Sequence, residues 1–354
     1  MKYKLLAVAL VLYALGTAYL WYGRPTMLPV IGAAVILPST DQPAPAEELR
    51  SVSPQAPLIL IVEPNDGLGT LLSTIAAATK NVDLVIYELD DTQVEQALCN
   101  EESKGVAVRV LIQNVNHYGK HPNQAAYDAL QGCGVAVKWA PNYFALTHQK
   151  TFIVDNTTAI VMTFNLVSKY YATGRDFGLV DADSKDVAAI VAAFAADWNG
   201  QRTNAGEGSD LVWSPGSAST LLALIASASS TLDIYNEEMA DQRVTDALMA
   251  AAQRGVKVRV DMTYQSGWKG AFKDLEAAGA EVRTYSSSAK LYIHAKVIVA
   301  DNKEAFVGSE NFSQPSLDAN RELGLLITRP DVLSQLQQVF NQDWAGSRSY
   351  SPKS

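Results

Sequence analysis

The sequence contains little positive charge for its length. Its 28 lysines and arginines are outnumbered by 37 aspartates and glutamates, so the formal net charge of the 354 residues is −9. Proteins that bind nucleic acids usually present a basic face. The charge balance therefore disfavours a general nucleic-acid binder, although it leaves room for a local basic groove.

Histidine and cysteine are also scarce, with four and two residues. His117 and His121 have the spacing of a metal-binding pair, but a glycine lies between them, a proline follows them and no third ligand is evident. We therefore expect a polar loop there and no metal cofactor. Cys99 and Cys133 lie near the ends of consecutive predicted helices. The sequence leaves two states open for them: a disulfide, which an exported protein can keep, or two buried thiols.

Apolar residues are abundant, because 48% of the chain is hydrophobic, and they suffice for a sizeable core. Residues 1–28 contain two lysines and then an apolar run of 18 residues from Leu5, which predicts a signal peptide or a short membrane anchor. In both cases the remainder of the chain is expected to be exported. Residues 38–57 hold five prolines, so residues 29–57 are predicted to form a linker.

One chemical pattern then occurs twice. In the stretch HAKVIVADNKEAFVGSEN, His294 and Lys296 lie two residues apart in a β-like run, so their side chains share one face of a strand. Ser309 and Asn311 share a face of the returning strand, and the four polar groups can converge on one anion. The first copy lies 146 residues earlier and keeps the same spacing: His148, Lys150, Thr163 and Asn165.

Two acids accompany each copy. Asp155 and Asp301 end the first strand of each pair beside an asparagine, where a turn also favours aspartate. Asp176 and Glu322 follow them by 21 residues each. Repetition of the whole set at one offset argues against a chance arrangement of surface residues.

These motifs resemble the signature of the phospholipase D superfamily, which is HxK, four residues, Asp, six residues and GSxN. The first copy departs from it where Met162 and Thr163 replace glycine and serine. The resemblance implies an α/β fold of two similar halves, each a mixed, mostly parallel sheet flanked by helices, related by a pseudo-twofold axis and sharing one active site. The expected boundaries are residues 58–205 for half 1, 206–345 for half 2 and 346–354 for a tail.

The resemblance also implies a mechanism of two displacements. One histidine attacks phosphorus, and the other acts first as general acid and then as general base. By similarity to two-motif members, His148 is expected to be the nucleophile and His294 the acid. Six residues would hold the phosphate: Lys150, Lys296, Thr163, Asn165, Ser309 and Asn311. The remaining members of the catalytic set are the acids Asp155, Asp301, Asp176 and Glu322, of which the last two would orient the histidines.

The expected function is hydrolysis of the head-group ester of glycerophospholipids by a secreted phosphodiesterase at a membrane surface. Three alternatives stay open: a phosphatidyltransferase of the cardiolipin synthase type, a nuclease of the same superfamily, and a noncatalytic binding module. The sequence gives no sign of an obligate protein partner. Glu237 and Glu238 follow a predicted strand of half 2, where they either reach the pocket or lie on the surface.

Overall fold

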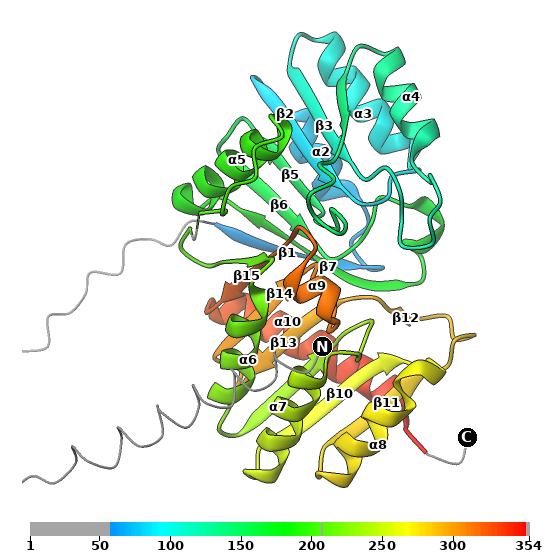
Figure 1. Ribbon diagram of the computed structural model, residues 1–354, viewed down its shortest axis with the longest axis vertical. Helices are drawn as coiled ribbons and strands as arrows, with labels where there is room; N and C mark the ends of the chain where they lie inside the picture. The colour runs from blue at the N-terminus through cyan, green and yellow to red at the C-terminus, as the bar shows by residue number, and fades with distance from the viewer. Residues whose placement is uncertain (1–56, 207, 352–354) are drawn as a thin grey trace, which may run out of the picture. The chain divides into compact units, whose positions relative to one another are not determined.

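The computed structural model describes residues 57–206 and 208–351 and contains two α/β halves that pack against each other (Figure 1). The predicted signal peptide or anchor, and the linker up to residue 56, lie outside the described residues, so export stays a prediction. Within the described ranges, no helix is both long and apolar enough to cross a bilayer.

Half 1 alternates apolar strands with amphipathic helices. Asp91 and Asp183 start the helices α3 and α5, since each side chain accepts hydrogen bonds from two backbone amides of the first turn. Its strands lie in the order β1-β7-β6-β5-β2-β3-β4. The elements are β1 (Leu58–Glu63), α2 (Gly69–Ala76), β2 (Asn81–Ile86), α3 (Thr92–Ser103), β3 (Ala107–Ile112), α4 (Gln124–Gly132), β4 (Ala136–Trp139), β5 (Thr151–Val154), β6 (Thr158–Met162), η1 (Ser168–Tyr170), β7 (Gly174–Asp181) and α5 (Ser184–Trp198).

Half 2 repeats this order of elements. Asp241 caps α7 as Asp91 caps α3 in half 1. Its strands lie in the order β16-β11-β10-β9-β13-β14-β15-β8. The elements are β8 (Leu211–Ser214), α6 (Ser217–Ser227), β9 (Thr231–Tyr235), α7 (Gln242–Gln253), β10 (Lys257–Thr263), η2 (Ser266–Trp268), α8 (Lys269–Ala277), β11 (Glu281–Tyr285), β12 (Tyr292–Ile293), β13 (Lys296–Ala300), β14 (Glu304–Gly308), α9 (Gln314–Asp318), β15 (Glu322–Ile327), α10 (Pro330–Gly346) and β16 (Arg348–Ser349).

The predicted fold class, two mixed sheets flanked by helices, is confirmed, but the sheets are not mostly parallel. Parallel pairing within the two sheet orders is confined to β2–β3 and β3–β4 in half 1 and to β9–β10 and β10–β11 in half 2. The hairpins β5–β6 and β13–β14 join β2 and β9 in the antiparallel sense. The reason is that each hairpin returns directly through a turn, whereas parallel neighbours need a crossover helix.

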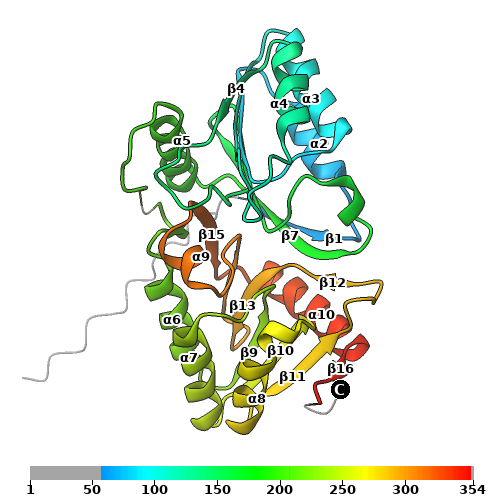
Figure 2. The same ribbon diagram turned by 45° about the vertical axis from the view of Figure 1, so that its right-hand side comes forward.

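A shared core joins the halves. The helices α2, α3 and α4 cover the outer face of the first sheet, and α6, α7 and α8 cover that of the second (Figure 2). Between the sheets lies one buried cluster that includes Phe177 and Leu179 of β7, Val307 of β14 and Leu325 of β15, together with residues of α5 and α10. Because this cluster draws on both halves, neither half buries its inner face alone.

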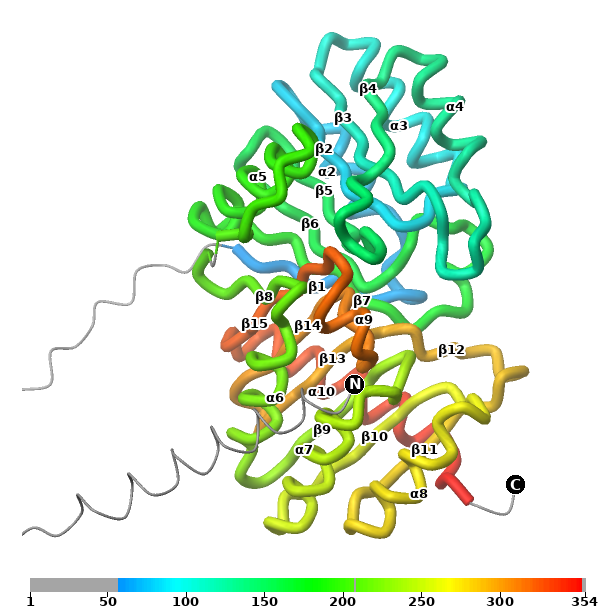
Figure 3. The backbone as a smooth tube through the Cα atoms, in the orientation of Figure 1, coloured from blue at the N-terminus to red at the C-terminus, as the bar shows by residue number. Residues whose placement is uncertain are grey.

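Three connections complete the fold. Strand β12 of half 2 runs beside β7 of half 1 and pairs with it in parallel (Figure 3). Residues of the expected tail form β16, which pairs with β11. Cys99 of α3 and Cys133 after α4 form a disulfide, with 5.7 Å between their Cα atoms. Of the two states that the sequence leaves open, the structure therefore has the disulfide.

Candidate active site

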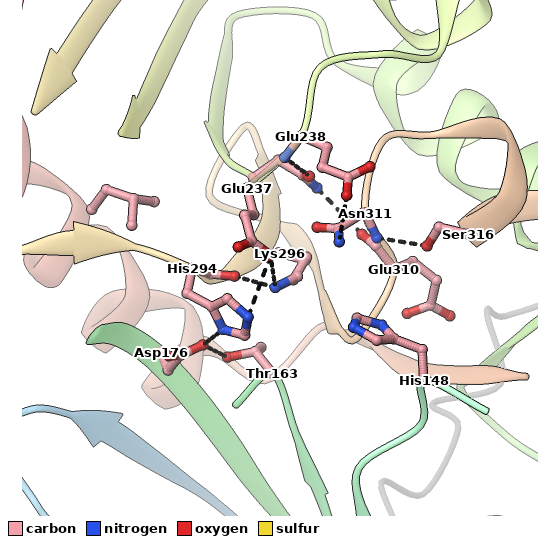
Figure 4. A network of polar contacts seen from close by, with 12 residues as sticks. His148, Thr163, Asp176, Glu237, Glu238, His294, Lys296, Glu310, Asn311 and Ser316 are labelled. Carbon is pink, nitrogen blue, oxygen red and sulfur yellow. Dashed lines mark hydrogen bonds and ion pairs between the residues drawn. The ribbon is translucent and has the colours of Figure 1, made fainter. Parts of the chain in front are cut away.

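The two motif histidines meet where the halves join. His148 lies in the loop before β5, and His294 lies between β12 and β13. Figure 4 shows both imidazole rings facing the space between them. Lys150 and Lys296 follow two residues later, and both side chains are fully buried. The junction of the halves thus gathers two imidazoles and two ammonium groups.

Each histidine is oriented by an acid of the other half. His148 Nδ1 lies 2.8 Å from Glu322 Oε2, and His294 Nδ1 lies 2.8 Å from Asp176 Oδ1. An ionised carboxylate can only accept a hydrogen bond, so Nδ1 carries a proton and Nε2 is the ring nitrogen left for chemistry. Neither half completes a histidine–acid pair by itself.

Two buried arginines repeat this exchange of contacts. Arg321 of half 2 binds Asp197 of α5, and Arg175 of half 1 binds Asp343 of α10, with Nε–Oδ2 distances of 2.8 and 2.6 Å. The carbonyl oxygens of the same two arginines accept hydrogen bonds from the backbone amides of the two motif histidines. Reciprocal contacts of this kind are those that a twofold relation between the halves produces.

The surroundings of His148 favour a neutral imidazole. Burial lowers the pKa of His148 to about 4; Glu322 opposes this change, and Lys150 and Lys296 add to it. The ring of Tyr87 packs edge-on against His148, with 4.6 Å between the ring centroids. At neutral pH the Nε2 atom therefore carries a lone pair, which is the form that a nucleophile requires.

His294 lies instead between two carboxylates. Its Nε2 is 3.3 Å from Glu237 Oε2, while its Nδ1 faces Asp176. Burial works against ionisation of Glu237, but the charges of His294 and Lys296 outweigh it and hold the pKa of Glu237 well below its usual range. An imidazolium at this position has an acceptor for each N–H group, which is an arrangement suited to a general acid.

The two lysines make equivalent contacts with their motif histidines. Lys150 Nζ donates to the carbonyl oxygen of His148, and Lys296 Nζ donates to that of His294. Lys296 Nζ also lies 3.2 Å from Glu237 Oε2. Burial lowers the pKa of Lys150 to about 7. Each ammonium keeps further N–H groups with which to bind phosphate oxygens.

The two motif asparagines have unused polar atoms. The side-chain oxygens of Asn165 and Asn311 are buried and have no hydrogen-bond partner among the described residues. The amide nitrogen of Asn311 lies 3.4 Å from Glu238 Oε1. An amide nitrogen carries two N–H donors, so Asn311 keeps one for a phosphate oxygen beyond its contact with Glu238.

The two motif hydroxyls are not placed for phosphate binding, contrary to expectation. Thr163 Oγ1 donates to Asp176 Oδ1 at 2.6 Å and accepts from the amide of Phe177 at 2.9 Å. Ser309 Oγ accepts from the amide of Leu323 at 3.1 Å. Both side chains are fully buried, because neighbouring strands cover them. Thr163 thus positions an acid, and Ser309 supports the start of β15.

Asp155 and Asp301 lie outside the site, which corrects their place in the catalytic set. Each follows its motif lysine by five residues and ends the strand that begins there. At the usual rise per residue of a strand, the aspartate is therefore about 16 Å from the lysine along the chain. Asp155 accepts hydrogen bonds from the amides of residues 79–81, and Asp301 from those of residues 229–231. Both have positive φ, at 54°, as a tight hairpin turn requires. They tie each hairpin to the preceding strand.

The motifs did not assign three further residues of the site. Tyr87 packs against His148, Tyr292 binds Glu237, and Ser316 donates to Glu322 Oε1 at 2.6 Å. Tyr87 had a detectable signal, since it follows β2 just as Glu237 follows β9, 150 residues later. Among the described residues, no group of three or more His, Cys, Asp or Glu side chains is arranged to hold a metal ion.

A duplicated α/β fold with one histidine and one lysine per half around a shared pocket defines a phospholipase D-type phosphoryl-transfer site. The family model described as "Cardiolipin synthase, PLD-like domain" matches residues 71–198 and 221–344. The chain belongs to this family.

Curated relatives agree with that match. The major cardiolipin synthase of Bacillus subtilis (strain 168) is 25% identical over an alignment of 341 positions, which covers 82% of this chain and 70% of the relative. Cardiolipin synthase A of Pseudomonas syringae pv. syringae (strain B728a) is 26% identical over an alignment of 340 positions, which covers 82% of this chain and 69% of the relative. Phosphatidylserine synthase of Haemophilus influenzae Rd KW20 has a similar fold, with a TM-score of 0.66, 13% identity, and coverage of 83% of this chain and 87% of its own.

These names correct the expected role. The sequence suggests a secreted hydrolase that degrades lipid, whereas the curated relatives are named synthases of a phospholipid. The prediction of lipid degradation is therefore wrong. The motifs had no means to separate the two roles, because the same phosphohistidine can pass its group to water or to an alcohol. The prediction of a phospholipase D-type enzyme stands.

Proposed function

We propose that the protein is a phosphatidyltransferase, which moves a phosphatidyl group from one head-group alcohol to another. The family match and the names of the relatives favour transfer over hydrolysis. The observation that carries the mechanism is the difference between the two histidines. His148 is neutral beside an aromatic ring, and His294 lies between two carboxylates.

In the first displacement, His148 Nε2 attacks the phosphorus of the donor lipid. A P–N bond forms and the P–O bond to the leaving alcohol breaks, while His294 gives its proton to the leaving oxygen. Lys150 and Lys296 would stabilise the charge that grows on the nonbridging oxygens, with help from Asn311.

In the second displacement, the oxygen of the acceptor alcohol attacks the same phosphorus. The alcohol proton passes to His294, now neutral, and the P–N bond to His148 breaks as the new P–O bond forms. Asp176 and Glu322 hold the two rings in place throughout, because each accepts the Nδ1 hydrogen bond.

The test is a product analysis with a head-group-labelled donor. The full chain is incubated with phosphatidylglycerol that carries labelled glycerol in the head group. We expect diphosphatidylglycerol and free glycerol to form together, with phosphatidic acid as a minor product. Phosphatidylglycerol is both donor and acceptor in this assay, so phosphatidic acid as the main product at excess phosphatidylglycerol would contradict the proposal.

We also propose that the chain is exported and held at a membrane by residues 1–28, which fits a lipid substrate. Fractionation of cells that make the chain with and without these residues tests this. Retention of both forms in the cytoplasm would contradict it.

A further inference from the structure

The corresponding positions beside the two histidines carry different side chains. Glu237 follows β9 in half 2, and Tyr87 occupies the same place after β2 in half 1, 150 residues earlier. Tyr292 precedes His294 by two residues, where half 1 has Leu146 before His148. Half 2 thus presents a carboxylate and a phenol where half 1 presents an aromatic ring and an alkyl group.

The carboxylate of Glu237 is held at both oxygens. Tyr292 OH donates to Oε1 at 3.0 Å, and Gln265 Nε2 in turn donates to Tyr292 OH at 3.2 Å. Oε2 faces Lys296 Nζ at 3.2 Å and His294 Nε2 at 3.3 Å. In Figure 4, Glu237 lies above the ring of His294 and beside Lys296.

This location is where the exchanging alcohol must bind. Attack by His148 expels the leaving oxygen on the opposite side of phosphorus, next to His294 Nε2, and the acceptor hydroxyl enters at the same place. A group within hydrogen-bond distance of Nε2 is therefore a neighbour of both alcohols. Glu237 is the carboxylate in contact with that atom.

We propose that Glu237 positions the exchanging alcohol, which is a polyhydric alcohol. One hydroxyl of this alcohol exchanges its proton with His294, and a second hydroxyl donates a hydrogen bond to the carboxylate of Glu237. This inference rests on the proposed phosphatidyl transfer and names its alcohol class. Water and monohydric alcohols lack the second hydroxyl, so the contact favours polyols over both.

The charges around Glu237 favour a neutral donor. Lys296 already faces its carboxylate, so an ammonium group on the alcohol would be a second cation beside Lys296. A hydroxyl adds no charge, and a hydrogen bond to an ionised acceptor is stronger than one between neutral groups. A polyol therefore fits this position better than an amino alcohol does.

The experiment measures how the phosphatidyl group partitions between acceptors. The full chain, with a phosphatidyl donor in vesicles, receives glycerol, propan-1-ol or ethanolamine, and phosphatidyl alcohol is measured against phosphatidic acid. The wild-type protein should prefer glycerol to the other two by about tenfold or more, as one charge-assisted hydrogen bond allows. Glu237→Gln should remove most of that preference and raise the KM for glycerol, with little change in the KM for the donor.

Two further variants keep the test decisive. Tyr292→Phe removes the hydroxyl that holds Glu237, so it should shift the partition in the same direction by a smaller factor. Glu88→Gln is the matched control. Glu88 is the half 1 counterpart of Glu238, and it contacts Asn116 rather than a histidine. It should leave the glycerol preference unchanged.

The outcomes separate the two proposals. If the wild-type protein forms phosphatidyl alcohols but Glu237→Gln and Tyr292→Phe keep the wild-type partition and glycerol KM, phosphatidyl transfer stands and the role of Glu237 is wrong. A wild-type preference for ethanolamine would also overturn that role. A wild-type protein that forms no phosphatidyl alcohol overturns both.

Discussion

Half 1 and half 2 each contribute one histidine and one lysine to the site, but different side chains surround the two histidines. His148 packs against Tyr87 and is buried, so its pKa falls to about 4. His294 contacts Glu237 through Nε2 and Asp176 through Nδ1. The shared motif thus supplies the reactive groups, and in the proposed mechanism the residues after β2 and β9 favour attack by His148 and proton donation by His294.

The frame that holds these groups is nearly symmetric, in contrast to the pocket. Arg175 with Asp343 and Arg321 with Asp197 repeat one buried ion pair on both sides of the interface. The two halves therefore share the buried ion pairs of the scaffold and differ in the side chains that surround the two histidines.

The largest predicted effect comes from the acids that orient the rings. In Glu322→Gln, the side-chain amide can donate to Nδ1, which moves the proton of His148 to Nε2 and blocks its lone pair. We expect the first displacement to slow by roughly 10²- to 10⁴-fold. It is measured as the single-turnover release of nitrophenol from a nitrophenyl phosphatidyl ester.

Asp176→Asn sharpens the comparison on the same donor. Nitrophenol leaves without much protonation, so this change beside His294 should cost far less in the first turnover. Equal losses in the two variants would contradict the division of roles.

The second prediction concerns the ion pairs of the frame. Asp343→Ala and Asp197→Ala each leave a buried arginine unpaired, and we expect each to lower the free energy of unfolding by about 3–5 kcal/mol. Each aspartate also accepts from a tyrosine hydroxyl, Asp343 from Tyr235 at 2.6 Å and Asp197 from Tyr143 at 3.0 Å. Tyr235 is fully buried whereas Tyr143 is partly exposed, so the change in half 2 should cost more.

Urea unfolding of the two variants measures this difference. In the matched double change, Asp197→Ala with Arg321→Met, the unpaired charge is gone, and most of the lost stability should return. A double variant no more stable than Asp197→Ala alone would show that the arginine charge is not the cause.

The third prediction follows from the lowered pKa values. The nucleophile must be neutral, so kcat/KM should fall as the pH drops through about 4, the pKa of His148. The ammonium of Lys150 must be protonated to stabilise phosphate, so kcat/KM should also fall as the pH rises through about 7. Lys150→Arg keeps its charge at higher pH and should move the alkaline limb upward. An unmoved limb would assign it to another group.

The smallest effects are predicted at the hairpin turns. Asp155→Ala and Asp301→Ala remove hydrogen bonds to backbone amides that solvent partly replaces, so each should cost about 1 kcal/mol of unfolding free energy. Transfer activity should stay close to that of the unmodified protein. A loss of more than about tenfold in kcat, with the fold intact by circular dichroism, would return these residues to the catalytic set.

Much of the scaffold could be predicted from the sequence. The period of two along a strand puts His294 and Lys296 on one face, and the offset of 146 residues reveals the duplication. Local patterns do not show which strands pair, so the hairpins' return beside β2 and β9 was missed, and with it the largely antiparallel character of the sheets.

The site was predicted less completely, for physical reasons that lie between the halves. Spacing along the chain shows that Asp176 and Glu322 are equivalent, but each crosses the interface to reach its histidine, and only the packed fold shows which one. The sequence predicts that the hydroxyl of Thr163 binds phosphate, because a hydroxyl can donate to a phosphate oxygen. In the fold the hydroxyl donates instead to Asp176 of the neighbouring strand β7.

The central claim is that His148 carries the phosphatidyl group and His294 handles the protons. The most direct measurement uses the nitrophenyl phosphatidyl ester with His148→Ala and His294→Ala, followed by mass spectrometry of the quenched protein. His294→Ala should release about one nitrophenol per protein and keep the phosphatidyl group on the peptide that contains His148, because the second displacement lacks its base. His148→Ala should release none. A phosphatidyl group found on His294 in His148→Ala, with none on His148 in the other variant, would contradict the account.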